Sequence, residues 1–247
     1  MSLFKSKKVF CSAVIVAAGA SSRFGGDKLS APLGGMPVLA RTLGVFQASR
    51  LIDEIIVVTE SEKIMSVAAL CSEYRIHKAV KIVLGGQTRL ESALSGVSEV
   101  SNKAGLIAIH DGARPLITEA VIESAVKTAE RYRAAVPAVS SKDTVKLAKG
   151  QRVTQTPSRS DVFCIQTPQV FQPEIIKGAL TNALTEELSV TDDAQAVEAL
   201  GFPVYLSEGS EENIKITTPL DLMLAETILY CRKCDEEAAA KRQEGQK

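Results

Sequence analysis

A loop in the first thirty residues carries the residue types that bind phosphate. It lies in the segment VIVAAGASSRFGGDK, Val14 to Lys28, where small residues follow an apolar run. Small side chains from Ala17 to Ser22 let backbone N–H groups approach a ligand, and Arg23 and Lys28 add two positive charges. A triphosphate carries about four negative charges, and an oxyanion developing at its α-phosphorus needs fixed donors. The loop therefore predicts a triphosphate site; a flexible surface loop with two solvated cations is the alternative.

This loop matches neither of two common phosphate-binding motifs. The dinucleotide motif G-x-G-x-x-G, counted from Gly19, would need glycines where Ser21 and Phe24 stand. The P-loop motif would also need a glycine at position 24, and it would need Ser or Thr where Leu29 follows Lys28. The missing glycines disfavour an oxidoreductase that binds NAD(P)H on a Rossmann fold.

Apolar runs that read as strands alternate with helix-like periodic segments along most of the chain. We expect strands at Ser12–Ala18, Glu54–Thr59, Val80–Leu84, Gly105–His110 and Pro203–Ser207. We expect helices at Pro37–Ser49, Ser61–Tyr74, Arg89–Ser101, Thr118–Tyr132, Pro173–Ala183 and Asp192–Leu200. Near-continuous Val/Ile strands between helices predict an α/β fold, with a mostly parallel, Rossmann-like sheet covered by helices on both faces.

Three segments should meet at one edge of this sheet. Ligands of parallel sheets bind beyond the carboxyl ends of the strands. The loop after Ala18, the pair Gly85-Gly86 and the pair His110-Asp111 all follow predicted strands. A carboxylate at this position, Asp111, can bind a metal ion or a substrate hydroxyl, although a turn-forming aspartate is the alternative. We assign no role to His110.

Two further cations are candidates for the same site. Arg114 follows Asp111 closely, and a structural salt bridge is the alternative reading of it. Lys215 stands shortly before a predicted helix N-terminus, which prefers anions. A lysine there does not stabilise the helix dipole and is available to bind a phosphate. The alternative is an ordinary surface lysine with no role in binding.

The middle of the chain breaks the alternating pattern. Thr144–Leu147 and Arg152–Thr156 flank Lys149-Gly150-Gln151, which predicts a β-hairpin with glycine at the turn. A projecting hairpin cannot bury both of its faces alone. We therefore expect one domain over residues 1–247, in which residues 139–161 form a protruding arm that makes a homodimer.

The C-terminal region predicts a well-defined helix start. Thr218 and Asp221 form a capping box, and Pro219 takes the first helical position. An apolar stripe should run along this helix. Its members are Leu220, Leu224, Ile228 and Cys231. The charged, alanine-rich tail after Glu236 is expected to fray.

Composition and cysteine usage narrow the class of protein. Lys plus Arg and Asp plus Glu each number 29, so nothing indicates bulk attraction to nucleic acid or membranes, and no apolar run has the length of a membrane span. Five scattered cysteines favour a reducing, cytoplasmic location. Cys231 and Cys234 form a CxxC with no second Cys/His pair nearby, which disfavours a zinc site.

Several short motifs, in order from about Val14 to Glu226, resemble one family of nucleotidyltransferases. They are AAGASSRFGGDK, HDGARP, VPAVSSKDTVK, TPSR, QTPQVF, VTDDAQAVEALG and NIKITTPLDL. Together they resemble the 2-C-methyl-D-erythritol 4-phosphate cytidylyltransferases of the non-mevalonate isoprenoid pathway. Ribitol-5-phosphate cytidylyltransferases share much of this pattern, so the acceptor stays open. A non-catalytic nucleotide-binding module is a third, weaker reading.

The resemblance implies three groups of site residues. The catalytic group is Arg23, Lys28, Arg159 and Lys215. The nucleotide-binding group is Ala17, Ala18, Gly19, Gly86, Gln87 and Ser92. The group that binds the polyol phosphate is Asp111, Gly112, Arg114, Thr144, Thr167 and Thr191. It also implies Mg²⁺, held mainly by the CTP phosphates, with ligands in the protein left unidentified.

The implied reaction is an in-line attack of the acceptor phosphate on the α-phosphorus of CTP. The phosphate is already ionised, so neither a covalent intermediate nor a general base is needed. This chain departs from the usual pattern at four points. The segment between Arg23 and Lys28 is short, Leu29 stands where Gln is usual, Gln87 where an acidic residue is common, and Gly112 where Ala is common.

Overall fold

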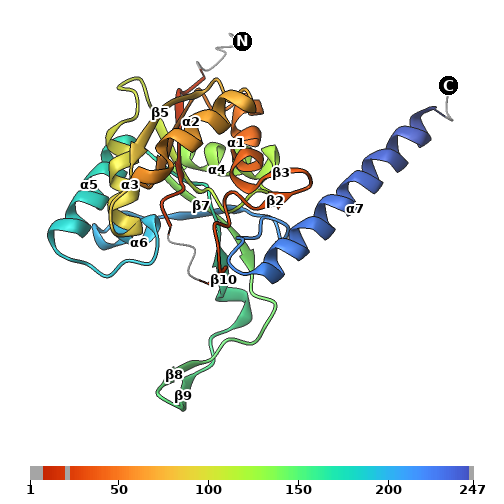
Figure 1. Ribbon diagram of the computed structural model, residues 1–247. Coiled ribbons are helices and arrows are strands. Elements are labelled where there is room, and N and C mark those ends of the chain that lie inside the picture. The colour runs from red at the N-terminus through yellow and green to blue at the C-terminus, as the bar shows by residue number, and fades with distance from the viewer. Residues whose placement is uncertain (1–7, 20–22, 245–247) are drawn as a thin grey trace, which may run out of the picture.

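The computed structural model describes residues 8–19 and 23–244. In these residues the strands of the central sheet lie in the order β10-β7-β11-β6-β1-β4-β5, and β12 pairs with β7 (Figure 1). Its strands are β1 (Cys11–Val16), β4 (Glu54–Thr59), β5 (Ala79–Leu84), β6 (Leu106–Asp111), β7 (Ala134–Ser140), β10 (Phe163–Ile165), β11 (Gln169–Phe171) and β12 (Tyr205–Glu208). Strands β5, β4, β1 and β6 are parallel, and β11 and β10 run antiparallel to their neighbours.

Helices cover both faces of the sheet. They are α1 (Val38–Ala48), α2 (Ile64–Glu73), α3 (Arg89–Ser98), α4 (Glu119–Tyr132), α5 (Pro173–Thr185), α6 (Asp193–Ala199) and α7 (Pro219–Glu244). Successive β1 residues point to opposite faces. Ile15 joins a core with α1, α2, α4 and α7, whereas Val14 joins a second core with α3, α5 and α6. The predicted α/β fold with a mostly parallel, covered sheet is confirmed.

Most predicted elements are present, with ends displaced by a few residues. Glu54–Thr59 is a strand over the predicted range, and it is buried throughout. Strand β7 was not predicted as a strand, and its last residues fall inside the range expected for the arm. Val139 and Ser140 pair with Cys164 and Phe163 of β10. The chain therefore leaves the sheet after Ser140. Two short strands, β2 (Pro32–Leu33) and β3 (Met36–Pro37), were also missed.

The predicted hairpin is present and stands away from the body of the molecule (Figure 1). Its strands are β8 (Leu147–Lys149) and β9 (Arg152–Gln155), so β8 begins where the first strand was expected to end. Gly150 at the turn has a φ of +58°, a left-handed conformation that glycine adopts without strain. Every residue of both strands is exposed, so the hairpin buries no core of its own.

Helix α7 confirms the predicted start; of the predicted stripe it packs Ile228 against the core but leaves Leu220, Leu224 and Cys231 exposed. Asp221 Oδ2 accepts hydrogen bonds from the backbone N–H groups of Thr217 and Thr218 at 2.9 and 2.7 Å. Leu220 and Leu224, however, are 72% and 48% exposed. The core-facing residues are Ala225, Leu222, Ile228 and Leu229. The stripe was misassigned because α7 touches the body along a narrow face and then projects beyond it (Figure 1).

The expectation that the tail frays is also wrong. Helix α7 continues to Glu244, through an alanine-rich segment of strong helix formers. A Lys233–Glu237 pair four residues apart, with an N···O distance of 3.9 Å, adds a weak contact along it. Among the described residues, no helix combines the length and the apolar character needed to cross a membrane.

Candidate active site

A cavity of about 240 Å³ lies at the carboxyl ends of β1 and β6. Eight of the residues predicted for the site line it. They are Ala17, Ala18, Gly19, Lys28, Gln87, Ser92, Asp111 and Lys215. A larger groove of about 550 Å³ lies against α1. We assign the site to the smaller cavity because charged side chains from four separate segments line it.

Local hydrogen bonds fix the segment that carries Lys28. Asp27 accepts from the Leu29 N–H at 3.2 Å and from the Ser30 hydroxyl at 2.8 Å, which makes an Asx-type turn. Leu29 is buried, and its carbonyl accepts from the N–H of Leu39 at 3.0 Å. Leu29 thus anchors the loop in the core, while the half-buried Lys28 beside it faces the cavity.

Lys28 is an unneutralised cation. Within residues 8–19 and 23–244 it makes no ion pair, and Arg23 is likewise unpaired and exposed. Burial lowers the pKa of the Lys28 ammonium, and the charges of Lys215 and Arg23 act in the same direction while Asp111 opposes them. An anion in the cavity would relieve this repulsion. Ala20, Ser21 and Ser22, the rest of the predicted loop, lie outside the described residues.

The Gly85-Gly86 turn brings the N-terminus of α3 to the cavity. Thr88 and Glu91 form a capping box at this helix start. The N–H of Gly86 donates to Ser92 Oγ at 3.2 Å. A Cβ atom on Gly86 would lie 2.2 Å from Cβ of Glu91, so only glycine fits this turn. The nucleotide-binding candidates Gly86, Gln87 and Ser92 are therefore held together by one capped helix start.

A half-buried arginine missed by the sequence analysis joins two carboxylates at the site. Arg89 donates from its two terminal nitrogens to the two oxygens of Asp193, at 2.9 and 2.8 Å. Its Nε lies 3.4 Å from Asp111 Oδ1. Burial lowers the pKa of Arg89, but Asp193 and Asp111 outweigh it and raise the pKa above its ordinary value. No sequence signal links positions 89 and 193, because only the tertiary structure, in which α3 and α6 both pack against α5, brings their first residues together.

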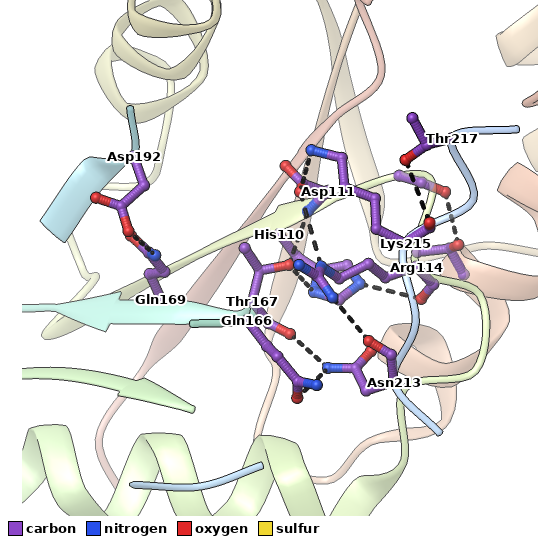
Figure 2. A network of polar contacts seen from close by, with 12 residues as sticks. His110, Asp111, Arg114, Gln166, Thr167, Gln169, Asp192, Asn213, Lys215 and Thr217 are labelled. Atoms are coloured by element: carbon purple, nitrogen blue, oxygen red, sulfur yellow. Dashed lines mark hydrogen bonds and ion pairs between the residues drawn. The ribbon is translucent and has the colours of Figure 1, made fainter. Parts of the chain in front are cut away.

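Asp111 is surrounded by three cations. Lys215 Nζ lies 2.8 Å from Asp111 Oδ2, and Arg114 Nε lies 3.7 Å from the same oxygen (Figure 2). Burial would raise the pKa of Asp111, but Arg89, Lys215 and Arg114 together hold it well below its usual range. The carboxylate therefore stays charged at any physiological pH.

His110 and Thr167 lie behind Asp111 rather than in the cavity. Nε2 of His110 is 3.3 Å from the carbonyl oxygen of Arg114, which only accepts, so we assign the ring hydrogen to Nε2. Thr167 Oγ1 then donates to Nδ1 at 2.9 Å and accepts from the Asp111 N–H at 3.1 Å. Burial lowers the pKa of His110 to about 3, so the ring is neutral.

The remaining predicted residues lie around the cavity without lining it. The Gly112 carbonyl accepts from Thr42 at 2.8 Å, and a Cβ there would lie 3.2 Å from Cδ1 of Leu39. Thr191, just before α6, donates from its N–H and its hydroxyl to Oε1 of Gln195 in that helix, at 2.7 and 3.0 Å. Neither Gly112 nor Thr191 is among the described residues that line the cavity.

The two predicted residues of the arm lie together on its surface. Arg159 Nη2 donates to Thr144 Oγ1 at 3.2 Å, and both side chains are exposed. Neither is among the described residues that line the cavity. Within this single chain, the arm pair forms a cluster separate from the site.

Comparisons with known proteins identify the family of this chain. The profile of the family described as 2-C-methyl-D-erythritol 4-phosphate cytidylyltransferase matches residues 11–231. This chain belongs to that family. The enzyme of that name from Halalkalibacterium halodurans is 44% identical over 220 residues, which cover 88% of this chain and 96% of the relative. That from Dehalococcoides mccartyi is 43% identical over 229 residues, covering 92% and 98%.

Solved structures of the cytidylyltransferase family share the fold. The 4-diphosphocytidyl-2C-methyl-D-erythritol synthase of Anaerococcus prevotii superposes with a TM-score of 0.82 at 32% identity, covering 90% of this chain and 97% of that one. The 2-C-methyl-D-erythritol 4-phosphate cytidylyltransferase of Thermus thermophilus superposes with a TM-score of 0.71 at 31% identity, covering 88% and 98%. The chain is thus a nucleotidyltransferase of this family.

Proposed function

We propose that this chain transfers the cytidylyl group of CTP to the phosphate of 2-C-methyl-D-erythritol 4-phosphate and releases pyrophosphate. The family match over residues 11–231 supports this acceptor over ribitol 5-phosphate. The observation that carries the proposal is Lys28, which makes no ion pair with the described residues and lies in the same cavity as Asp111 and Lys215. That set of charges suits two phosphate-bearing substrates and a polyol.

The proposed step is a single displacement. An oxygen of the acceptor phosphate forms a bond to the α-phosphorus of CTP, while the bond from that phosphorus to the bridging oxygen of the β-phosphate breaks. The leaving group carries away the electron pair as pyrophosphate. Lys28 and Arg23 stabilise the charge that builds on the α-phosphoryl oxygens, and the ionised acceptor needs no base. Consistent with this, the buried, neutral His110 has no proton-transfer role in the scheme.

The nucleotide occupies the part of the cavity beside the start of α3. Small residues at Ala17, Ala18 and Gly19 leave room for the base and ribose, and the turn at Gly86 and Gln87 offers backbone groups to cytosine. Ser92 acts through the Gly86 N–H, with which its hydroxyl is hydrogen-bonded.

The acceptor lies on the Lys215 side, against Asp111 and Arg114. We propose that its phosphate also meets Arg159 and Thr144 of a second subunit, because the exposed arm carries these residues without a core of its own. Gly112, Thr167 and Thr191 contribute by shaping the neighbouring turns. The proposed assembly is a two-fold dimer with exchanged arms.

Mixing two inactive variants tests the exchanged arm. Lys28→Ala subunits are combined with Arg159→Ala subunits, and subunit exchange is verified by mass spectrometry. With random pairing about half the dimers are mixed, and each mixed dimer has one intact site, so about a quarter of wild-type activity should return. No recovery after verified exchange would mean that the arm acts within its own chain.

Magnesium fits the proposed site with a limited contribution from the protein. No cluster of three or more His, Cys, Asp or Glu side chains suited to a metal exists in the described ranges. Mg²⁺ is commonly held by one or two carboxylates plus substrate phosphates. Asp111, ionised and lining the cavity, is the residue that would hold it. When bound, the ion neutralises triphosphate charge.

Release of pyrophosphate from CTP tests the function. The purified chain is incubated with CTP, Mg²⁺ and either 2-C-methyl-D-erythritol 4-phosphate or ribitol 5-phosphate. We expect turnover with the first acceptor and much less with the second. Greater turnover with ribitol 5-phosphate would reassign the acceptor, and CTP binding without turnover of any acceptor would indicate a non-catalytic module. The unpaired cysteines in the described residues are compatible with the cytoplasmic location we propose.

A further inference from the structure

Asn213 is a fully buried amide at the meeting point of three segments behind the cavity (Figure 2). Its side-chain Nδ2 donates to the backbone carbonyl of Thr167 at 2.9 Å and to Oε1 of Gln166 at 3.3 Å. Its own backbone carbonyl accepts from Arg114 Nη1 at 2.7 Å. One residue thus ties the segment before α7 to the turn after β6 and to the turn between β10 and β11.

The orientation of the Asn213 amide is determined by its neighbours. Gln166 Nε2 donates to the Ser210 carbonyl at 2.7 Å, and Gln166 Oε1 accepts from the Ser210 N–H at 3.2 Å. The oxygen of Gln166 is therefore the atom that faces Asn213. Both partners of the Asn213 side chain are acceptors, so only its NH₂ group satisfies them.

This arrangement leaves one buried atom without a partner. Among the described residues nothing hydrogen-bonds to Oδ1 of Asn213. A buried polar atom left unpaired opposes folding, so an apolar residue would be the simpler choice for stability alone. The asparagine is therefore better explained by the contacts it makes than by a contribution to the core.

Those contacts control the backbone that carries Lys215. Asn213 anchors the segment on one side, and the Ile216 N–H, which donates to the Ala113 carbonyl at 2.8 Å, anchors it on the other. Between the two anchors, Lys215 reaches Asp111 Oδ2 at 2.8 Å. A lysine stem is flexible, so the position of its ammonium depends on where the backbone is held.

We propose that Asn213 is a positioning residue that holds Lys215 and Arg114 against Asp111. It touches neither substrate and acts chiefly through the position of Lys215. The inference rests on the proposed function, in which the three groups bind the acceptor phosphate and the polyol.

The variant Asn213→Asp tests this role with little change in shape. A carboxylate places an oxygen against the two acceptor oxygens of Thr167 and Gln166, so the segment must shift. We expect kcat/KM for 2-C-methyl-D-erythritol 4-phosphate to fall at least tenfold, with the CTP dissociation constant changed less than threefold. Asn102→Asp, an exposed asparagine elsewhere in the chain, is the matched control and should behave as wild type.

A double-mutant cycle separates positioning from a structural role. If Asn213 acts through Lys215, then Asn213→Asp should lower kcat/KM less than twofold in the Lys215→Ala background. A tenfold loss in both backgrounds would overturn the inference. Thermal unfolding identifies a variant that fails to fold. In that case Gln166→Met, which removes one partner of the Asn213 amide, should show the same dependence on Lys215.

A crystal structure of Asn213→Asp, or of Gln166→Met where the first variant does not fold, keeps the test independent of turnover. We expect the Lys215 Nζ to Asp111 Oδ2 contact of 2.8 Å to be lost. An unchanged contact would overturn the positioning role, whatever the activity of the enzyme. If the wild type fails to release pyrophosphate with this acceptor, the proposed function fails, and the structure alone decides the role of Asn213.

Discussion

Replacing Lys28 by alanine should lower kcat about a hundredfold while CTP still binds. Lys28 is half-buried, faces the cavity and has no carboxylate partner in the described residues, so its charge is available to the α-phosphoryl group. Two unit charges about 4 Å apart interact by about 4 kcal/mol at an effective dielectric of about 20. Losing a preorganised donor at a transition state costs about 3 kcal/mol, and each 1.36 kcal/mol is about tenfold in rate.

The assay is pyrophosphate release at saturating CTP and acceptor, with CTP affinity measured separately by calorimetry. Lys28→Met keeps the length of the side chain and should lose as much kcat as Lys28→Ala, which would assign the effect to charge. Lys81→Ala removes a lysine that pairs with Glu99 outside the cavity and serves as the control. A kcat within threefold of wild type in Lys28→Met would refute the assignment of Lys28 to the transition state.

Three further predictions concern pH, packing and base selection. The free energy of unfolding should fall by up to about 1.4 kcal/mol per pH unit below about pH 6.5. Burial lowers the pKa of His110 to about 3, so in this range only the unfolded chain takes up that proton. Urea unfolding between pH 8 and 5 should show a weaker dependence of this free energy on pH for His110→Asn than for the wild type, and equal dependences would contradict the prediction. Gly86→Ala should lower Tm by several degrees, because its Cβ would lie 2.2 Å from Cβ of Glu91. Gly44→Ala in α1 is the control, because its Cβ would contact nothing within 4 Å, and it should not lower Tm. If scanning calorimetry gave Gly86→Ala the Tm of the wild type, the predicted clash would be wrong. The kcat/KM for CTP should be at least about a hundredfold higher than that for UTP, because uracil would leave backbone carbonyls near Gly86 and Gln87 buried and unpaired. Equal kcat/KM values for the two nucleotides would rule this out.

The local pattern of residues determined the fold class and the edge of the sheet at which the site lies. Strands such as Glu54–Thr59 are apolar throughout because both faces of a covered parallel sheet are buried. The ends of the strands then predict where ligand-binding loops converge. On this basis Lys28, Gln87 and Asp111 were expected at one edge of the sheet, and in the structure they line one cavity. These are properties of short segments and of a general rule of sheet topology.

Capping signals were equally local and equally informative. Thr218 and Asp221 begin α7 as predicted, because a side chain three residues away satisfies the first N–H groups of a helix. The start of α3 was likewise predicted at Arg89, and the capping box of Thr88 and Glu91 explains why the helix begins there.

Which side of a helix is buried, and which distant charges pair, depended on the tertiary structure. Helix α7 was expected to bury Leu220 and Leu224, yet the body supports it along Ala225, since a stripe of apolar residues does not reveal how much partner surface exists. Arg89 meets Asp193 across 104 positions of sequence, and Asn213 joins Gln166 and Thr167 across 47 and 46. No local pattern encodes such pairs, because each depends on how whole elements pack. The sequence therefore predicted which groups bind phosphate, and the placement of α3, α6 and the segment before α7 decided how those groups are held.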